Sequence, residues 1–317
     1  MARSAVPLVV VLALGACGES AGDDLKGRGP PPTPVGCVDD VSAGQHVFDC
    51  DGLTHDVSVP AACVEAACGL IVDVHGGTMN GQMEDKNTNM RALGAAHGYV
   101  VLQPNAVNNV WNAATDDAKV LAFIEQVVSA WHVDRKRVHL MGFSQGGYMT
   151  WRFVCHHTDL FASAAPAAAA GSPVISIETG CTFTGTDVPS EPIDLLYMHG
   201  TQDGLVSFSN AVELRGAIAQ ELALGPEAVV QSDGAHRWTR QTESHGKVFE
   251  FIQHDYVSDS SVGLPPFGVA IKGHCYPGSK DYTPSVPGQL MGFGCIGENA
   301  FHWGEVALRF FMAHPRP

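Results

Sequence analysis

The chain has 317 residues, of which 33 are acidic and 18 are basic, so its formal net charge is −15. This balance argues against nucleic acid as a partner, because binding to phosphates requires clustered Lys and Arg side chains. The acid excess instead supports solubility.

Residues 1–16 have the pattern of a secretion signal. One cation precedes an apolar run at residues 5–16, which is shorter than the roughly 20 residues needed to span a bilayer. The run ends in Leu14-Gly15-Ala16-Cys17, which resembles a bacterial lipobox, where the cysteine becomes the lipidated first residue of the mature protein. Ordinary cleavage without lipidation is the alternative. We therefore expect an extracytoplasmic protein that is secreted or is held at the cell envelope only through a lipid anchor on Cys17.

Residues 17–36 are expected to form a tether. They include few apolar residues and contain the run Gly29-Pro30-Pro31-Pro32-Thr33-Pro34, which favours an extended polyproline conformation. Residues 37–317 show no second linker and no internal repeat, so we expect one folded domain there.

The nine cysteines suit an oxidising compartment. If Cys17 is lipidated, eight remain, an even number that allows on the order of 100 disulfide connectivities. The sequence does not fix the pairing, but proximity along the chain favours Cys37–Cys50, Cys63–Cys68, Cys155–Cys181 and Cys275–Cys295. No C-x-x-C or H-x-x-x-H cluster is present, so neither a metal site nor another cofactor is expected.

Strand-like and helical patterns alternate along residues 37–317. We predict strands at residues 54–59, 69–74, 99–103, 138–141, 193–198, 248–254 and 267–271, and helices at 116–131, 211–224 and 305–312. Such alternation predicts an α/β fold with a mostly parallel central sheet and helices on both faces. The chemistry of such a sheet lies at the carboxyl ends of its strands.

Residues 137–147, RVHLMGFSQGG, are the most informative segment. They read as a buried strand, a G-x-S-x-G turn and the start of a helix, which is the nucleophile elbow of an α/β hydrolase. Gly142 and Gly146 are expected because a side chain at either position would collide with the neighbouring strand and helix. Ser144 would then present its hydroxyl to a cleft. The alternative is a glycine-rich turn without chemistry.

A serine nucleophile needs a histidine base and a carboxylate that orients the histidine, and α/β hydrolases carry them in the order Ser, Asp or Glu, His. Asp203 follows the predicted strand at 193–198 and would lie at its carboxyl end, so it is our candidate acid. Asp194 begins the same strand and would lie at the wrong end. Asp233 is a weaker alternative.

His274 is the candidate base because it follows the predicted strand at 267–271 and precedes the final helix. Its neighbour Cys275 can clamp the loop through a disulfide. His254 and His302 are rivals. Three further histidines are expected to be core or strand-end residues: His75, His139 and His199.

Ester hydrolysis also needs two backbone N–H groups directed at the oxyanion. One is expected from Gln145, which follows the nucleophile. The other is expected from the loop His75-Gly76-Gly77 after the predicted strand at 69–74, with Gly77 as the donor and Thr78 as the alternative. A glycine-rich structural turn is the competing interpretation of this loop.

These residues resemble the esterase family that includes polyhydroxybutyrate depolymerases, feruloyl esterases and acetylxylan esterases. The resemblance spans about residues 54–314 and is carried by HGG at 75–77, the pair at 111–112, DRKRV at 134–138, GFSQGGYM at 142–149, FASAA at 161–165, HGTQD at 199–203 and GHCYPG at 273–278. It implies a Ser-His-Asp esterase whose triad is Ser144, Asp203 and His274.

The resemblance also suggests residues that contact the substrate. Trp111 would line the acyl or aromatic side of the cleft, although a core position is equally open. Thr78 and Tyr276 complete the expected substrate-binding set, and Tyr276 stands where the family usually has Trp. No carbohydrate- or polymer-binding module follows the catalytic segment.

The expected function is a serine esterase that hydrolyses polyhydroxyalkanoate-type polyester, such as polyhydroxybutyrate, or its oligomers through an acyl-enzyme. Two other enzyme readings stay open: a feruloyl or acetylxylan esterase acting on plant polysaccharide, and a polyvinyl-alcohol-type β-diketone hydrolase. A catalytically inactive hydrolase scaffold that binds surfaces is the non-enzymatic alternative, and the presence of all three triad residues in order argues against it. The expected partner is an ester substrate.

Overall fold

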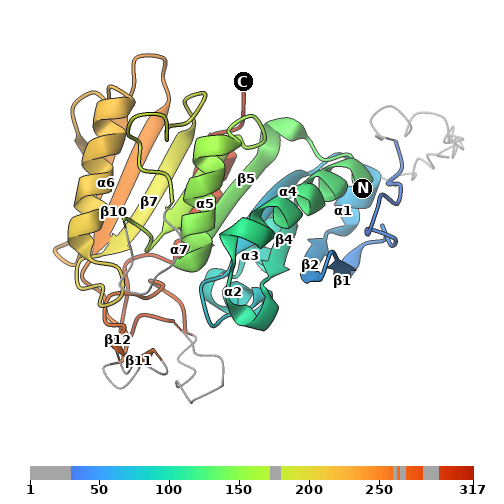
Figure 1. Cartoon of the computed structure of the whole chain (residues 1–317), viewed down its shortest axis with the longest axis horizontal. Coiled ribbons are helices and arrows are strands. Elements are labelled where there is room, and N and C mark those ends of the chain that lie inside the picture. Colours follow the sequence, from blue (N-terminus) through green and yellow to red (C-terminus); the bar gives the residue numbers. More distant parts are fainter. Residues whose placement is uncertain (1–29, 172–179, 260–262, 265–268, 281–292) are drawn as a thin grey trace, which may run out of the picture.

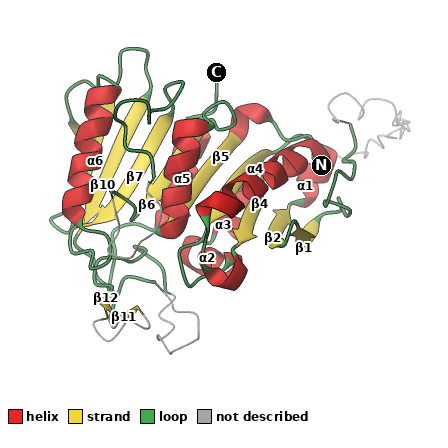
Figure 2. Ribbon diagram, viewed as in Figure 1, coloured by secondary structure: helices red, strands yellow, loops and turns green. Residues whose placement is uncertain are grey.

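The computed structural model describes residues 30–171, 180–259, 263–264, 269–280 and 293–317. Across these residues, ten strands form one sheet in the order β1-β2-β4-β3-β5-β6-β7-β10-β9-β8, with helices over both faces (Figure 1, Figure 2). The predicted α/β architecture with a mostly parallel central sheet is confirmed. The predicted signal at residues 1–16, Cys17 and the first part of the predicted tether lie outside the described residues.

The centre of the sheet is parallel and its two edges are antiparallel. The parallel strands, in sheet order, are β4 (Tyr99–Asn105), β3 (Gly69–Val74), β5 (Val138–Phe143), β6 (Ser163–Ala167), β7 (Asp194–Gly200) and β10 (Val248–His254). The antiparallel strands are β1 (Gly44–Cys50) and β2 (Leu53–Val59) at one edge, and β9 (His236–Thr242) and β8 (Ala228–Ser232) at the other. Strands β3, β5 and β7 are buried along their whole length, as expected for parallel strands covered on both sides.

The helices divide between the two faces of the sheet. The face in front in Figure 1 carries α4 (Ala113–Ala130), α5 (Gln145–His156) and α6 (Phe208–Glu221). The ion pair between Arg152 of α5 and Asp117 of α4, at 2.6 Å, joins two of them. The opposite face carries α2 (Gly81–Thr88), α3 (Met90–His97) and α7 (Trp303–Ala313), and α7 contacts both of the others. The remaining short elements are α1 (Ala61–Glu65) and the 3-10 turns η1 (Val107–Asn109) and η2 (Arg135–Arg137).

Several strands were not predicted, and one predicted strand belongs to a different sheet. The patterns miss β1, β6, β8 and β9; β6 is rich in alanine, and β8 is exposed at every residue, so neither has the apolar signal of a strand. The predicted strand at 267–271 does not extend the main sheet. Its described part forms β12 (Val269–Ala270), which pairs only with β11 (Gly263–Leu264), while residues 267–268 lie outside the described residues.

The disulfides match the pairing favoured by proximity. The bonded pairs are Cys37–Cys50, Cys63–Cys68, Cys155–Cys181 and Cys275–Cys295. The end of the predicted tether already contacts the domain, because the Thr33 N–H donates to the carbonyl oxygen of Ala130 at the end of α4 over 2.9 Å. None of the helices in the described part of the chain has the length and apolar character needed to cross a membrane.

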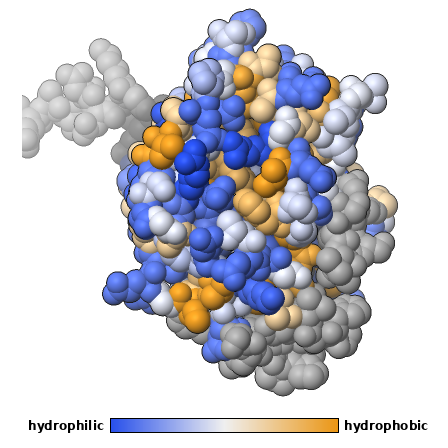
Figure 3. Space-filling view, turned by 90° about the vertical axis from the view of Figure 1, so that its left-hand side faces the viewer, coloured by the Kyte–Doolittle hydropathy of each residue, from blue (hydrophilic) through white to orange (hydrophobic). Residues whose placement is uncertain are grey.

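The surface on the side of α6 and β10 is mostly hydrophilic, with small apolar patches (Figure 3). Strand β8 forms this edge of the sheet, and Val229 and Val230 are about half exposed there, at 52% and 46%. Arg237 of β9 pairs with Glu227 next to β8 at 2.6 Å, and Arg215 of α6 pairs with the same carboxylate. Charges along an edge strand oppose its pairing with another chain.

The contact between α7 and α2 depends on a glycine. A Cβ atom on Gly304 would collide with the carbonyl oxygen of Thr88 at the end of α2. We predict that Gly304→Ala destabilises the fold by about 1–3 kcal/mol, because the helices must separate. Gly216→Ala in α6 is the matched control, since a Cβ atom there meets nothing within 4 Å, and it should stabilise slightly. Urea unfolding of both variants measures the difference; equal effects would contradict the packing argument.

Candidate active site

Ser144 occupies a strained turn between β5 and α5. Its backbone has φ 53° and ψ −116°, a conformation that residues with side chains seldom adopt. A Cβ atom on Gly146 would collide with the carbonyl oxygen of Val74, and one on Gly142 would collide with the backbone of Gly146. The predicted need for both glycines is confirmed. Ser144 is half-buried while its immediate neighbours in sequence are buried, so the turn directs this residue outward.

Asp203 and His274 form a close buried pair. His274 Nδ1 donates to Asp203 Oδ2 over 2.7 Å, and the two side chains are 1% and 0% exposed. The other oxygen, Oδ1, accepts the N–H groups of Leu205 and Val206, both at 2.8 Å. Burial alone would raise the pKa of Asp203, but the charge of His274 and its hydrogen bond outweigh burial, so this pKa lies below its usual value. Asp203 is therefore an ionised carboxylate that holds the His274 proton on Nδ1.

The two loops that carry this pair approach each other closely enough to share backbone hydrogen bonds. The Gly273 N–H donates to the Gln202 carbonyl oxygen over 3.1 Å, and the Gly204 N–H donates to that of Ile271 over 3.2 Å. A Cβ atom on Gly200 would collide with the Gly273 carbonyl oxygen. The acid loop and the histidine loop therefore meet because glycines remove the side chains between them.

The second ring nitrogen of His274, Nε2, is buried and has no hydrogen-bond partner among the described residues. With the proton on Nδ1, Nε2 is an acceptor. The His274 ring packs against that of Phe143 with centroids 4.8 Å apart, and Phe143 directly precedes Ser144. The histidine thus lies beside the turn that carries the serine, with an acceptor available for a proton.

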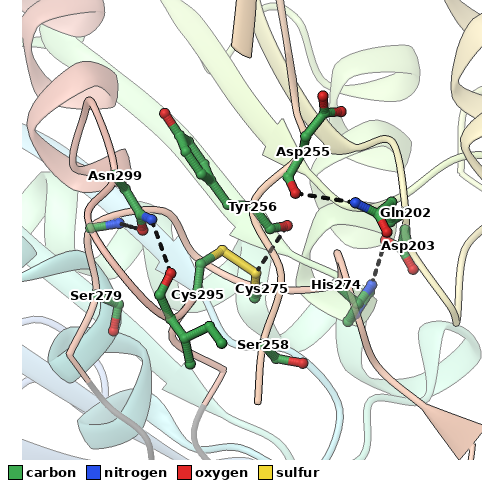
Figure 4. Close-up of a disulfide and its surroundings, with 12 residues drawn as sticks. Gln202, Asp203, Asp255, Tyr256, Ser258, His274, Cys275, Ser279, Cys295 and Asn299 are labelled. Atoms are coloured by element: carbon green, nitrogen blue, oxygen red, sulfur yellow. Dashed lines mark hydrogen bonds and ion pairs between the residues drawn. A yellow bond between two sulfur atoms is a disulfide. The ribbon is translucent and has the colours of Figure 1, made fainter. Parts of the chain in front are cut away.

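A disulfide supports the histidine loop from behind. Cys275, which follows His274, is bonded to Cys295 (Figure 4). The Tyr276 N–H donates to the Phe293 carbonyl oxygen over 2.7 Å, and the Cys295 N–H donates to that of Tyr276 over 3.0 Å. The loop around His274 is therefore crosslinked to residues 293–295.

The competing acids lie away from this pair. Asp194 is at the start of β7, at the opposite end from Asp203, and pairs with Lys247 at 2.8 Å. Asp233 lies in an exposed turn, where it accepts the N–H of His236 over 3.0 Å.

The competing histidines are core or structural residues. His254 is buried in β10, and burial lowers its pKa to about 3. His302 is the residue preceding α7. His199 uses both ring nitrogens in hydrogen bonds within the core, although it also lies 3.5 Å from Asp203. His75 and His139 are fully buried, as predicted.

The candidate oxyanion donors come from the loop after β3 and from the start of α5. Gln145 is the first residue of α5, so its N–H has no acceptor within the helix. Gly77 is adjacent, since a Cβ atom on it would lie 3.0 Å from Gln145 Oε1. The Gly77 N–H donates to no other described residue, whereas the Thr78 N–H donates to the Asn109 carbonyl oxygen over 2.7 Å. The alternative donor, Thr78, is therefore occupied.

Trp111 holds this loop in place. Its backbone exchanges two hydrogen bonds with the side-chain amide of Gln145, at 3.1 and 3.2 Å. Its indole N–H donates to the His75 carbonyl oxygen over 2.9 Å, and the residue is only 6% exposed. Trp111 therefore packs behind the oxyanion loop, and its contact with a substrate stays a prediction.

The other two expected substrate contacts differ in exposure. Thr78 is half-buried, and its hydroxyl has no partner among the described residues. Tyr276 has no exposed surface, and its hydroxyl donates to Glu84 Oε2 over 2.6 Å, so it lies behind the site. The sequence patterns gave no role to Glu84 or to its neighbour Asp73. An acid within the apolar run at 70–74 is the one signal that could have drawn attention to Asp73.

Comparisons with known proteins show which families the chain resembles. Residues 55–158 match the family model named BD-FAE. The chain is 25% identical over 143 residues to a bifunctional acetylxylan esterase/xylanase of Neocallimastix patriciarum, covering 44% of this chain and 20% of that protein. It is 29% identical over 184 residues to a probable feruloyl esterase C of Aspergillus niger, covering 56% and 61%. The chain thus spans less than two thirds of these two relatives.

A third relative matches over most of its length. Feruloyl esterase C of Emericella nidulans is 27% identical over 278 residues, covering 84% of this chain and 93% of that protein. Among solved structures, an acetyl xylan esterase from Aspergillus awamori superposes with a TM-score of 0.55 at 13% identity, covering 67% of this chain and 93% of that one. The chain therefore has the α/β-hydrolase fold and resembles the feruloyl and acetylxylan esterases.

Proposed function

We propose that this protein is a serine esterase that hydrolyses feruloyl or acetyl esters of plant polysaccharide. The observation that carries the proposal is the buried 2.7 Å pair of Asp203 and His274, whose free Nε2 lies beside the strained Ser144 turn. A carboxylate, a histidine with one free acceptor and a serine at an elbow are the parts that acyl transfer to serine requires.

In the proposed mechanism, His274 Nε2 accepts the hydroxyl proton of Ser144 while the serine oxygen attacks the ester carbonyl carbon. Asp203 stabilises the imidazolium that forms, and the N–H groups of Gly77 and Gln145 donate to the oxyanion. The imidazolium then gives its proton to the leaving alcohol, which leaves an acyl-enzyme. Water attacks this intermediate by the same route and releases the carboxylic acid.

The relatives favour ester-bearing polysaccharide over the hydroxybutyrate polyester that was expected first. The similar proteins are named as feruloyl and acetylxylan esterases, and one match covers 93% of a feruloyl esterase. The four disulfides among the described residues further support an extracytoplasmic location. Lipid attachment at Cys17 stays part of the proposal.

A polar groove beside the oxyanion loop suits a hydroxyl-rich alcohol. It has a volume of about 460 Å³ and is lined mainly by amide and charged side chains: Thr54, Asp56, Asn80, Gln82, Arg91, Asn105 and Asn109, with Val47 and Ala106. Asn109 also accepts the Thr78 N–H, so the groove adjoins the loop that carries Gly77. Planar amides both donate and accept hydrogen bonds, as sugar hydroxyls require.

Replacement of the nucleophile tests the activity itself. We expect Ser144→Ala to lower kcat/KM on p-nitrophenyl acetate by at least about a thousandfold, because no other group can form the acyl-enzyme. Ser232→Ala, on the exposed edge strand β8, is the control and should match the parent. An inactive parent would instead support a binding scaffold.

Release of ferulate from methyl ferulate, acetate from acetylated xylan and hydroxybutyrate from polymer then ranks the substrates.

Replacement of the acid tests how His274 is held. We expect Asp203→Asn to lower kcat by roughly 10⁴-fold, because an amide donor facing Nδ1 moves the histidine proton to Nε2 and removes the acceptor. A variant with activity near that of the parent would show that another group orients the base.

The same variant has a pH signature in its stability. Because the pKa of Asp203 is lowered in the folded state, its ionisation stabilises the fold above about pH 4, and this contribution is lost as the pH falls through the folded pKa. The difference in Tm between the parent and Asp203→Asn should therefore shrink on acidification from pH 7 to pH 3.

Groove variants test the polysaccharide part of the proposal. Gln82→Ala removes an exposed amide, and Asn109→Gly removes a half-buried one while tolerating its φ of 61°. Each should raise KM for a feruloylated oligosaccharide by about 2- to 10-fold through one lost hydrogen bond. KM for p-nitrophenyl acetate should stay constant, as should both values for the control Gln220→Ala in α6. Equal changes for both substrates would argue against a sugar-binding groove.

A further inference from the structure

Two buried acids lie behind the site and have no part in the proposed chemistry. Asp73 is near the end of β3 and Glu84 is in α2, and both are 0% exposed. Asp73 Oδ2 accepts the Thr88 hydroxyl over 2.8 Å and the Gln103 amide over 2.9 Å. Glu84 Oε2 accepts the Tyr276 hydroxyl over 2.6 Å. The remaining oxygens, Asp73 Oδ1 and Glu84 Oε1, accept from no donor among the described residues.

Among the residues that the structure describes, no cation neutralises these acids. Within the described part of the chain, no Lys or Arg forms an ion pair with either carboxyl group, and Arg91 instead donates to Gln103 over 2.6 Å and pairs with Asp56 at 3.4 Å. Asp73 and Glu84 interact with each other, so two ionised carboxylates here would repel each other out of water without a compensating cation among the described residues. A single proton between the two otherwise unused oxygens removes the second charge and satisfies both atoms.

The pKa shifts of these groups agree with a proton that stays on the acid pair at neutral pH. Burial, followed by the charge of Asp73, raises the pKa of Glu84 well above its usual value, and Asp85 adds to the effect. Burial also raises the pKa of Asp73, to about 6, against its hydrogen bonds to Gln103, Thr88 and Glu84. Burial and Glu84 raise the pKa of Tyr276, so its hydroxyl stays a donor. At neutral pH, Glu84 therefore carries the proton and donates it toward Asp73.

This pair is connected to the base through Tyr276, which is two residues beyond His274. The Tyr276 ring stacks on Phe143 with centroids 4.0 Å apart, and Phe143 also contacts the His274 ring at 4.8 Å. One helical turn beyond Glu84, Asn87 accepts the Ser279 hydroxyl over 2.7 Å. Helix α2 therefore holds the histidine loop at two points, each joining residues 192 positions apart in sequence.

We propose that Asp73 and Glu84 share one proton and that this protonated pair, acting through Tyr276, positions the loop of His274. Its catalytic consequence rests on the proposed esterase function, whereas the shared proton does not. Glu84 donates to Asp73 Oδ1 and accepts from the Tyr276 hydroxyl, so it bridges β3 and the histidine loop. Loss of the proton at alkaline pH sets two carboxylates against each other, and the loop loses its support. Glu84 and Tyr276 are thus positioning residues for His274.

The shared proton is tested without a substrate. Glu84→Gln keeps the shape, a donor toward Asp73 and an acceptor for Tyr276, but cannot ionise. A raised folded-state pKa stabilises the protein fully below the unfolded pKa of about 4.3, and this contribution is lost as the pH rises. The Tm of Glu84→Gln relative to the parent should therefore increase from pH 5 to pH 9. The exposed α6 variant Glu213→Gln is the matched control and should show a constant difference.

Infrared spectroscopy gives an independent measurement of the proton. At pH 7 the parent and Glu213→Gln should show the carbonyl band of a protonated carboxylic acid, and Glu84→Gln should lack it. A parent without this band, or a Tm difference for Glu84→Gln that is constant with pH, would overturn the shared proton. Neither result would affect the proposed esterase activity.

Kinetics test the positioning role. Tyr276→Phe removes only the hydroxyl of a residue with no exposed surface, so kcat should fall by roughly 10- to 100-fold while KM stays constant. Glu84→Ala should reproduce this loss, and Glu84→Gln should restore kcat and extend activity to higher pH than in the parent. An unchanged kcat in Tyr276→Phe, or Glu84→Gln as impaired as Glu84→Ala, would refute the role. An inactive parent would refute the esterase proposal, and the two physical measurements would still decide the shared proton.

Discussion

The 2.7 Å hydrogen bond from His274 to Asp203 joins two loops that are 71 residues apart in sequence. It fixes the histidine proton on Nδ1, so the other nitrogen can only accept. That arrangement needs an ionised carboxylate in a buried position, and the N–H groups of Leu205 and Val206 stabilise its charge. In the proposed mechanism, the strained serine turn and the oxyanion loop act only together with this pair, which keeps His274 Nε2 free as a proton acceptor beside them.

The buried acids Asp203 and Glu84 have pKa values shifted in opposite directions because their neighbours differ. Asp203 meets a histidine and two backbone donors, which favour its charged form. Glu84 is buried beside a second acid, with no cation paired to it in the described part of the chain, which favours its neutral form. The same side-chain chemistry therefore serves to orient the base in one place and, in our proposal, to hold the loop of that base in another.

The oxyanion loop shows how one residue of the site depends on many others. Trp111 bonds both to the Gln145 side chain and to the His75 carbonyl oxygen, and the Thr78 N–H is bound to Asn109. The Gly77 N–H has no other acceptor among the described residues, so in the proposed mechanism it stays available to an oxyanion. Contacts within the protein thus decide which N–H groups of this loop stay available.

Local signals explain what the sequence could predict. The turn at Ser144 is set by glycines within two positions of it, and the buried parallel strands are short apolar runs, so both were recognised. Strands β8 and β9 have exposed positions and little apolar alternation, and β6 is rich in alanine, so these strands were missed. The strand predicted before His274 pairs in a separate small sheet, since an apolar run does not specify the sheet that it joins.

The sequence by itself determined the serine turn, the order of the candidate acid and base, and the central parallel strands other than β6, because each depends on neighbours along the chain. Only the tertiary structure decided that His274, and not His254 or His302, contacts Asp203. It also decided that Tyr276 points to Glu84 rather than to solvent, and that Asp73 and Glu84 are both fully buried. Such contacts join residues far apart in sequence, so the pattern and spacing of residues along the chain do not reveal them.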